Sequence, residues 1–172
     1  MNVLPVAHIV AVLLAVLALF SLRHELRETA VNVFDRSLPA LFAILAAAVL
    51  LIVSPGKRFE LWLLAIGVGL VGGLAMGMTL QGVKDFGNNL VRVYRAWDGV
   101  AAASALILLA LLRLVTSDLT GRQSGGHGVL GALAALLAAY LVGRVITFQF
   151  YTAPRTIHLD MFRGQKRART DI

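Results

Sequence analysis

Residues 61–80, LWLLAIGVGLVGGLAMGMTL, form an uninterrupted run without a charged side chain. At about 1.5 Å per residue, a helix of this length crosses a hydrocarbon core of about 30 Å. A helix also satisfies its own backbone hydrogen bonds in lipid, where water is absent. The run therefore predicts a membrane-spanning helix.

Apolar runs of similar character recur through the chain, which is 59% hydrophobic and 15% charged. A globular protein carries about 25% charged residues. The further runs lie at residues 3–22, 38–54, 99–115 and 129–151. We predict an all-α, integral membrane helical bundle of about five transmembrane helices over residues 1–151, followed by a basic tail at residues 152–172. A four-span version stays open, because residues 38–54 and 99–115 would each reach only about 26 Å as helices.

The distribution of Lys and Arg predicts the orientation, because the cytoplasmic connections of membrane proteins are enriched in both. With the N-terminus outside, eleven of the sixteen basic residues lie in the cytoplasm: Arg23, Arg27, Arg36, Lys84, Arg92, Arg95, Arg155, Arg163, Lys166, Arg167 and Arg169. Lys57, Arg58 and Arg122 lie outside, and Arg113 and Arg144 lie within spans. We therefore predict a multi-pass protein of the bacterial inner membrane with a cytoplasmic C-terminus.

The connection at residues 81–98 is too long for a tight turn and too polar to cross a membrane. Apolar residues recur in it at helical spacing, with charged and amide residues between them. This pattern favours an amphipathic helix in the membrane interface. Residues 91–93 also fit the alternation of a short strand, an alternative that stays open. Residues 23–37 repeat the helical pattern and indicate a second interfacial helix.

Small residues line one side of the predicted span at residues 61–80. Gly69, Gly73 and Gly77 form two overlapping GxxxG steps, a glycine zipper. Missing side chains let another helix backbone approach closely, which is how helices associate in lipid. We expect tight packing on another helix of this chain, for which residues 129–151 are a candidate. A contact with another subunit stays open.

Two arginines lie within predicted spans, where a charge costs at least a few kcal/mol unless it is paired or reaches the interface. Arg113 lies near an outer helix end, and Arg144 lies about 10 Å from an inner end. Three interpretations of Arg144 stay open: an anion or lipid-headgroup site, a contact with another subunit, and extension toward the cytoplasm. The sequence does not choose among its candidate partners, Asp85, Asp98 and Asp160.

Two histidines, His8 and His127, both fall near the predicted outer face. A facing pair of histidines can ligate haem or another metal. No motif or fixed spacing links them, so ordinary polar residues of the interface are the alternative, and we expect neither a cofactor nor a metal site. The absence of cysteine excludes thiolate metal ligands within the chain.

The tail concentrates four basic residues at Arg163, Lys166, Arg167 and Arg169. They are expected to bind anionic lipid headgroups and to help to fix the topology. The other basic residues lie between apolar runs, so we expect no nucleic-acid partner despite the net charge of +7. No catalytic triad, HExxH or Walker motif is present in the sequence, which predicts a protein that is not an enzyme.

A family resemblance rests on residues 69–112. There, a glycine-rich span leads to residues 90–99, LVRVYRAWDG, and then to another apolar span. This arrangement resembles the CcdC-like bacterial membrane proteins, which are small multi-span proteins named for an association with cytochrome c biogenesis. The resemblance covers about a quarter of the chain and implies no catalytic residues.

Small-residue packing faces and basic interfacial segments favour an accessory, scaffold or assembly subunit of a larger inner-membrane complex of respiratory or photosynthetic type. Its partners would be membrane lipids and other membrane-protein subunits. The alternative is a carrier or channel-like protein for a lipid or small anionic solute, using Arg144 and Arg113. A haem-binding membrane cytochrome that uses His8 and His127 is the third hypothesis.

Overall fold

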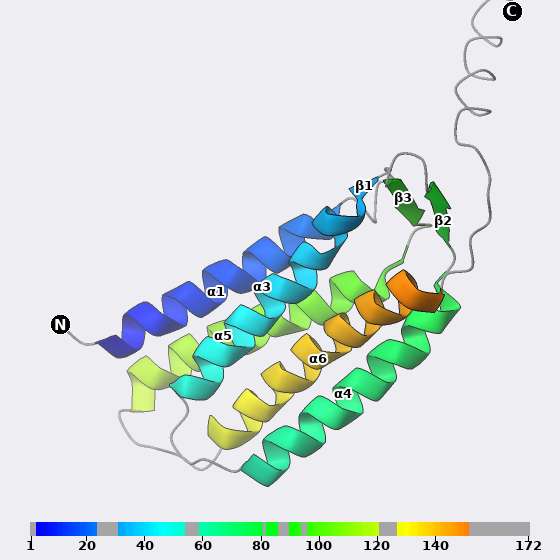
Figure 1. Ribbon diagram of the computed structural model, residues 1–172. Coiled ribbons are helices and arrows are strands. Elements are labelled where there is room, and N and C mark those ends of the chain that lie inside the picture. The colour runs from blue at the N-terminus through cyan, green and yellow to red at the C-terminus, as the bar shows by residue number, and fades with distance from the viewer. Residues whose placement is uncertain are drawn as a thin grey trace, which may run out of the picture.

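The computed structural model describes residues 3–23, 31–53, 59–80, 82–85, 90–93, 96–120 and 127–151. Its helices are α1 (Val3–Ser21), α3 (Val33–Ile52), α4 (Phe59–Thr79), α5 (Asp98–Thr120) and α6 (His127–Tyr151). Three short strands, β1 (Val31–Asn32), β2 (Gly82–Asp85) and β3 (Leu90–Val93), form a small sheet at one end of the bundle (Figure 1). The predicted helical bundle is confirmed.

The helices alternate in direction along the bundle (Figure 1). Helices α1, α4 and α6 end near the small sheet, whereas α3 and α5 begin there. We call this the sheet end and the opposite one the far end. Such alternation is what successive crossings of a membrane require.

Within the described part of the chain, four helices are long and apolar enough to cross a membrane, as in a multi-pass membrane protein. The segments that meet this criterion are Phe34–Ile52, Phe59–Thr79, Asp98–Thr116 and Gly128–Phe148. Helices α3 and α5 exceed the predicted runs at residues 38–54 and 99–115, because both continue into more polar flanks. The apolar part of α1, Val6–Ser21, is shorter.

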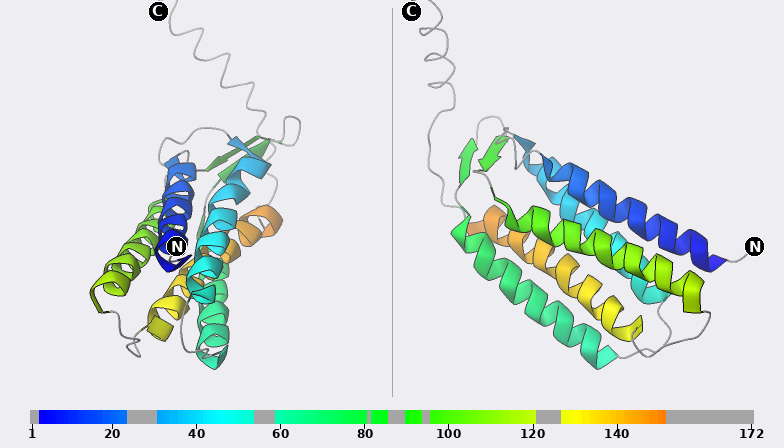
Figure 2. Two further views of the ribbon diagram at one scale, coloured as in Figure 1. Left: turned by 90° about the vertical axis from the view of Figure 1, so that its left-hand side faces the viewer. Right: turned by 180° about the vertical axis from the view of Figure 1, so that it is seen from behind.

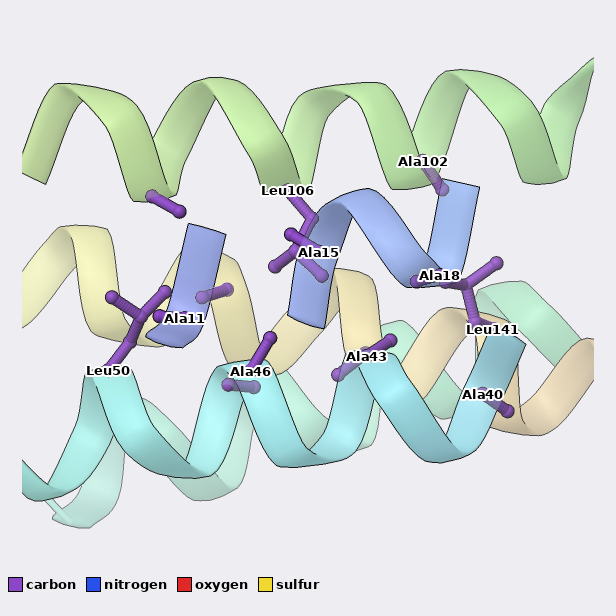
Figure 3. Close-up of a cluster of buried hydrophobic side chains, with 14 residues drawn as sticks. Ala11, Ala15, Ala18, Ala40, Ala43, Ala46, Leu50, Ala102, Leu106 and Leu141 are labelled. Carbon is purple, nitrogen blue, oxygen red and sulfur yellow. The ribbon is translucent and has the colours of Figure 1, made fainter. Parts of the chain in front are cut away.

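Alanine builds most of the centre of the bundle (Figure 3). Ala11, Ala15 and Ala18 of α1 recur at about one-turn spacing and are fully buried. Leu106 of α5 and Leu141 of α6 fill the space between the smaller side chains. Because lipid tails are as apolar as a protein interior, helices gain from association chiefly where their backbones come close. The alanine face thus packs α1 into the bundle core.

Helix α4 lies at the edge of the bundle and packs along its length on α6 (Figures 1 and 2). Gly69, Gly73 and Gly77 are buried in this contact. A methyl group at Gly69 would collide with the carbonyl oxygen of Leu136, and one at Gly73 with that of Tyr140. The structure therefore places the three glycines against another helix of the same chain.

In the connection at residues 81–98, the described residues 82–85 and 90–93 form a strand pair. The prediction of an interfacial helix there is wrong. Strands β2 and β3 pair antiparallel, with Val83 opposite Arg92, and β1 pairs with the other edge of β3, where Val31 is opposite Val91. The strand alternative for residues 91–93 is right. β-Branched residues suit a pleated surface, and β1 supplies hydrogen-bonding partners from a segment distant in sequence.

The second predicted interfacial helix, at residues 23–37, lies partly outside the described residues. Of its C-terminal part, Val31 and Asn32 belong to β1, and α3 begins at Val33. The described part of this connection therefore joins the sheet and the next helix, and does not form a separate amphipathic helix.

Substitution of Gly73 by Ala should destabilise the bundle, because the added methyl group meets the Tyr140 backbone. We expect a loss of about 1–3 kcal/mol in the free energy of unfolding, the usual cost of overpacking. Thermal unfolding in detergent measures it. Gly67→Ala is the matched control, since an added methyl group there has nothing within 4 Å. Equal stability of the two variants would contradict the assigned contact.

Candidate functional site

An ion pair joins α5 to α6 near the sheet end. The Arg144 Nε atom lies 2.8 Å from Asp98 Oδ2. Its Nη2 donates a hydrogen bond to Asp98 Oδ1 at 3.3 Å, so the guanidinium contacts both carboxylate oxygens. Arg144 is 1% exposed, and the Asp98 side chain is 14% exposed. The pair is therefore almost wholly enclosed by the protein.

The local sequence on each helix brings these groups together. Tyr140 and Arg144 are four residues apart on α6 and so lie on one face of the helix. The Tyr140 hydroxyl donates a hydrogen bond to Asp98 Oδ2 at 2.9 Å. Gly99 gives the guanidinium its space, because a methyl group at this position would lie 2.7 Å from Arg144 Nη1. Asp98 also begins α5, where the helix dipole stabilises a negative charge.

This arrangement explains how Arg144 is accommodated within a span. A buried ion is costly unless an opposite charge and further hydrogen bonds compensate for lost hydration. Asp98 supplies the charge, and Tyr140 adds a hydrogen bond to the same carboxylate. Of the partners that the sequence left open, the structure selects Asp98. The guanidinium is thus engaged by a carboxylate of its own chain.

Further polar contacts lie close to this pair. The single proton of the Thr147 hydroxyl is shared between the carbonyl oxygens of Leu74 at 3.2 Å and Gly143 at 3.0 Å, and so links α6 to α4. The guanidinium of Arg36 lies over the ring of Phe148, with Cζ 3.5 Å from the ring centroid. These contacts tie α3 and α4 to the part of α6 that carries Arg144.

Arg113 lies near the far end of α5 and is 2% exposed. Its Nη1 donates a hydrogen bond of 2.8 Å to the carbonyl oxygen of Leu50. Leu50 lies in the last turn of α3, whose carbonyl groups lack partners within the helix. A cation at this position also complements the negative end of the helix dipole. Arg113 therefore caps α3 from a neighbouring helix.

The two histidines lie on helices that share no extensive contact. His8 is buried in α1, which packs on α3 and α5, whereas His127 begins α6, which packs on α3, α4 and α5. Among the described residues, no group of three or more His, Cys, Asp or Glu side chains could hold a metal ion. Haem ligation by His8 and His127 stays a prediction.

The predicted lipid-headgroup residues Arg163, Lys166, Arg167 and Arg169 lie outside the described residues. Asp160, one of the candidate partners of Arg144, lies outside them as well.

Sequence reasoning named Arg144 and Asp98 but missed the contribution of Tyr140. The signal was available in the spacing of Tyr140 and Arg144, which places a phenol and a guanidinium on one helix face. The sequence could not show that Arg144 pairs with Asp98 and not with Asp85, because this choice depends on which helix end meets α6.

Comparison with protein-family models, with curated proteins and with solved structures found no match to this chain. The resemblance to the CcdC-like proteins therefore stays a prediction.

Substitution of Asp98 by Asn should leave Arg144 buried without an opposite charge. We expect the free energy of unfolding to fall by about 3–5 kcal/mol, the usual cost of breaking a buried ion pair. Thermal or denaturant unfolding in detergent measures it. The double variant Asp98→Leu, Arg144→Met should recover much of the loss, because apolar replacement of both partners removes the unpaired charge.

The matched control is Glu60→Gln, which removes an exposed carboxylate from the first turn of another helix. Its cost should not exceed about 1 kcal/mol. An Asp98→Asn variant as stable as this control would show that the ion pair does not stabilise the bundle.

Proposed function

We propose that this chain is a non-enzymatic membrane protein that packs into, or helps to assemble, a larger complex of the bacterial inner membrane. The observation that carries the proposal is the position of α4, which packs on α6 and turns the rest of its surface outward. Leu63, Leu64, Val68, Val71 and Met78 are exposed on this surface. A peripheral helix with a continuous apolar surface suits contact with another membrane helix.

The engagement of Arg144 by Asp98 supports a packing role over a carrier. A carrier that used Arg144 for an anionic solute would need its guanidinium available, whereas a carboxylate of the same chain occupies it. The polar contacts at the sheet end hold α4, α5 and α6 together. An assembly role also agrees with the resemblance of residues 69–112 to the CcdC-like proteins.

The outer surface of α4 offers a direct test. Gly67→Leu places a side chain on α4 where a methyl group has nothing within 4 Å, so the bundle itself should stay stable. We expect the wild-type chain, purified in a mild detergent, to carry other membrane proteins with it, and this variant to lose them. Affinity purification followed by mass spectrometry measures both.

Val16→Phe, at an exposed position of α1, is the matched control and should retain the partners. A wild-type chain isolated as a stable monomer, without co-purifying membrane proteins, would count against the proposal.

We also propose that α1 crosses the membrane, which gives five spans with the N-terminus outside and the C-terminus in the cytoplasm. Helix α1 runs alongside α3 and α5 in the bundle core, and it starts at the far end whereas α6 finishes at the sheet end (Figure 1). The Lys and Arg asymmetry supports a cytoplasmic sheet end.

The lack of native cysteine allows a clean test of this topology. A single cysteine at Asn2 should react with a membrane-impermeant maleimide in intact cells. One at Gln165 should react only after the inner membrane is permeabilised. Protection of both positions in intact cells would place the two termini in the cytoplasm and favour an even number of spans.

A further inference from the structure

Arg113 has hydrogen-bonding capacity that the described residues do not use. Its Nη1 donates to the carbonyl oxygen of Leu50, but its Nε is buried without a hydrogen-bond partner among those residues. The Leu50 carbonyl is a neutral acceptor, so it leaves the positive charge in place. A buried guanidinium in this state favours an anion beside it.

The described carboxylates near these helices lie elsewhere. Among the side chains described on α1, α3 and α5, those of Asp35 and Asp98 are the carboxylates, and both lie at the sheet end. Asp118 follows Arg113 by five residues on α5, but its side chain lies outside the described ones. Arg113 lies toward the far end. No described side chain on these three helices therefore provides a carboxylate at its level.

The helix register places His8 at the same level as Arg113. Figure 3 shows Leu106 of α5 against Ala15 of α1. His8 is seven residues before Ala15, and Arg113 is seven residues after Leu106. Seven residues are nearly two helical turns, so both residues lie on the contact faces of these antiparallel helices, about 10 Å farther toward the far end. His8 is 4% exposed, which agrees with a place inside the bundle.

The donors and the depth of Arg113 indicate the class of anion. The Nε–H of Arg113, which has no hydrogen-bond partner among the described residues, can donate to an oxygen of an oxyanion. Arg113 is three residues from Thr116, where the apolar segment Asp98–Thr116 ends. That separation is about 5 Å along the helix, close to the level of lipid headgroups. Phosphate is the oxyanion that lipids carry at this level.

We propose that Arg113, with His8 beside it, forms a binding site for a phosphate group at the far end of the bundle, supplied by a membrane lipid or by free phosphate. The site does not depend on the proposed assembly role. The guanidinium of Arg113 on α5 and an imidazole N–H of His8 on α1 would hold the phosphate, while the Nη1 bond to Leu50 keeps the guanidinium aligned with α3. The ligand would then join the three helices that meet at this level.

Binding to the full chain in detergent micelles tests the proposal. Native mass spectrometry measures adducts during titration with phosphatidylglycerol, with diacylglycerol, which lacks the phosphate, and with inorganic phosphate. We expect phosphatidylglycerol to bind and diacylglycerol not to bind. Arg113→Gln should weaken the first phosphatidylglycerol adduct by at least about tenfold, the effect of losing a charge-assisted hydrogen bond.

Two further variants keep the test decisive. Arg113→Lys retains the charge but not the Nε donor. This variant should fold, and it should bind phosphatidylglycerol at least about fivefold more weakly than the wild type does. Arg23→Gln removes an exposed arginine that stacks on Phe20 at the sheet end, 4.1 Å from the ring centroid, and should bind as the wild type does. Lipid adducts on the basic tail should form equally on the wild type and on all the variants, so they do not affect the difference in binding between them.

The phosphate arm separates the two sources of the ligand. If inorganic phosphate displaces the lipid adduct from the wild type and the Arg113 variants bind neither, the site takes free phosphate as well as a lipid headgroup. Equal binding of phosphatidylglycerol by the wild type, Arg113→Gln and Arg113→Lys would overturn the proposal. So would loss of a co-purified protein from these variants with lipid binding unchanged, because the counter-charge would then come from another subunit.

Discussion

Helices in lipid associate where their backbones approach closely and where their polar groups find one another, because burial of apolar side chains brings little gain there. Helix α6 meets this requirement on several sides. On the side of α4, an added methyl group at Gly143 would lie 2.5 Å from the Leu70 carbonyl oxygen. On the side of α5, Gly99 leaves space for the Arg144 guanidinium. Helices α3, α4 and α5 all pack on α6, while α1 packs on α3 and α5.

Two of the three buried arginines that the structure describes, Arg144 and Arg113, are accommodated in different ways. Arg144 faces a carboxylate and a phenol, so its charge is balanced within the chain. Arg113 faces a backbone carbonyl at the end of α3, which provides a dipole but no negative charge. The charge of Arg144 is therefore balanced within the chain, while Arg113 has the surroundings in which we propose a phosphate site. In this view, the charge of Arg144 stabilises the fold, whereas that of Arg113 is available to bind a ligand.

Much of the fold could be predicted from the sequence, because spans in lipid need long apolar runs and the glycine spacing marks a packing face. The strand at residues 90–93 was only an alternative to a helix in the sequence, since the choice depends on pairing with β1, about sixty residues away. The alanine face of α1 also went unrecognised, because alanine is common in apolar helices and carries no distinctive pattern. For the candidate site, the residue types could be read from the sequence, but the partner of Arg144 required the arrangement of the helix ends.

The small sheet has a consequence for the order in which the chain is completed during synthesis. Its central strand is β3, and β1 pairs with β3 rather than with a strand nearer in sequence. The connection before α3 must therefore wait until residue 93 has left the ribosome before its strand finds a partner. Helices α1, α3 and α4 would enter the bilayer before β1 can pair with β3. Helices α5 and α6 would then complete the bundle around the alanine core.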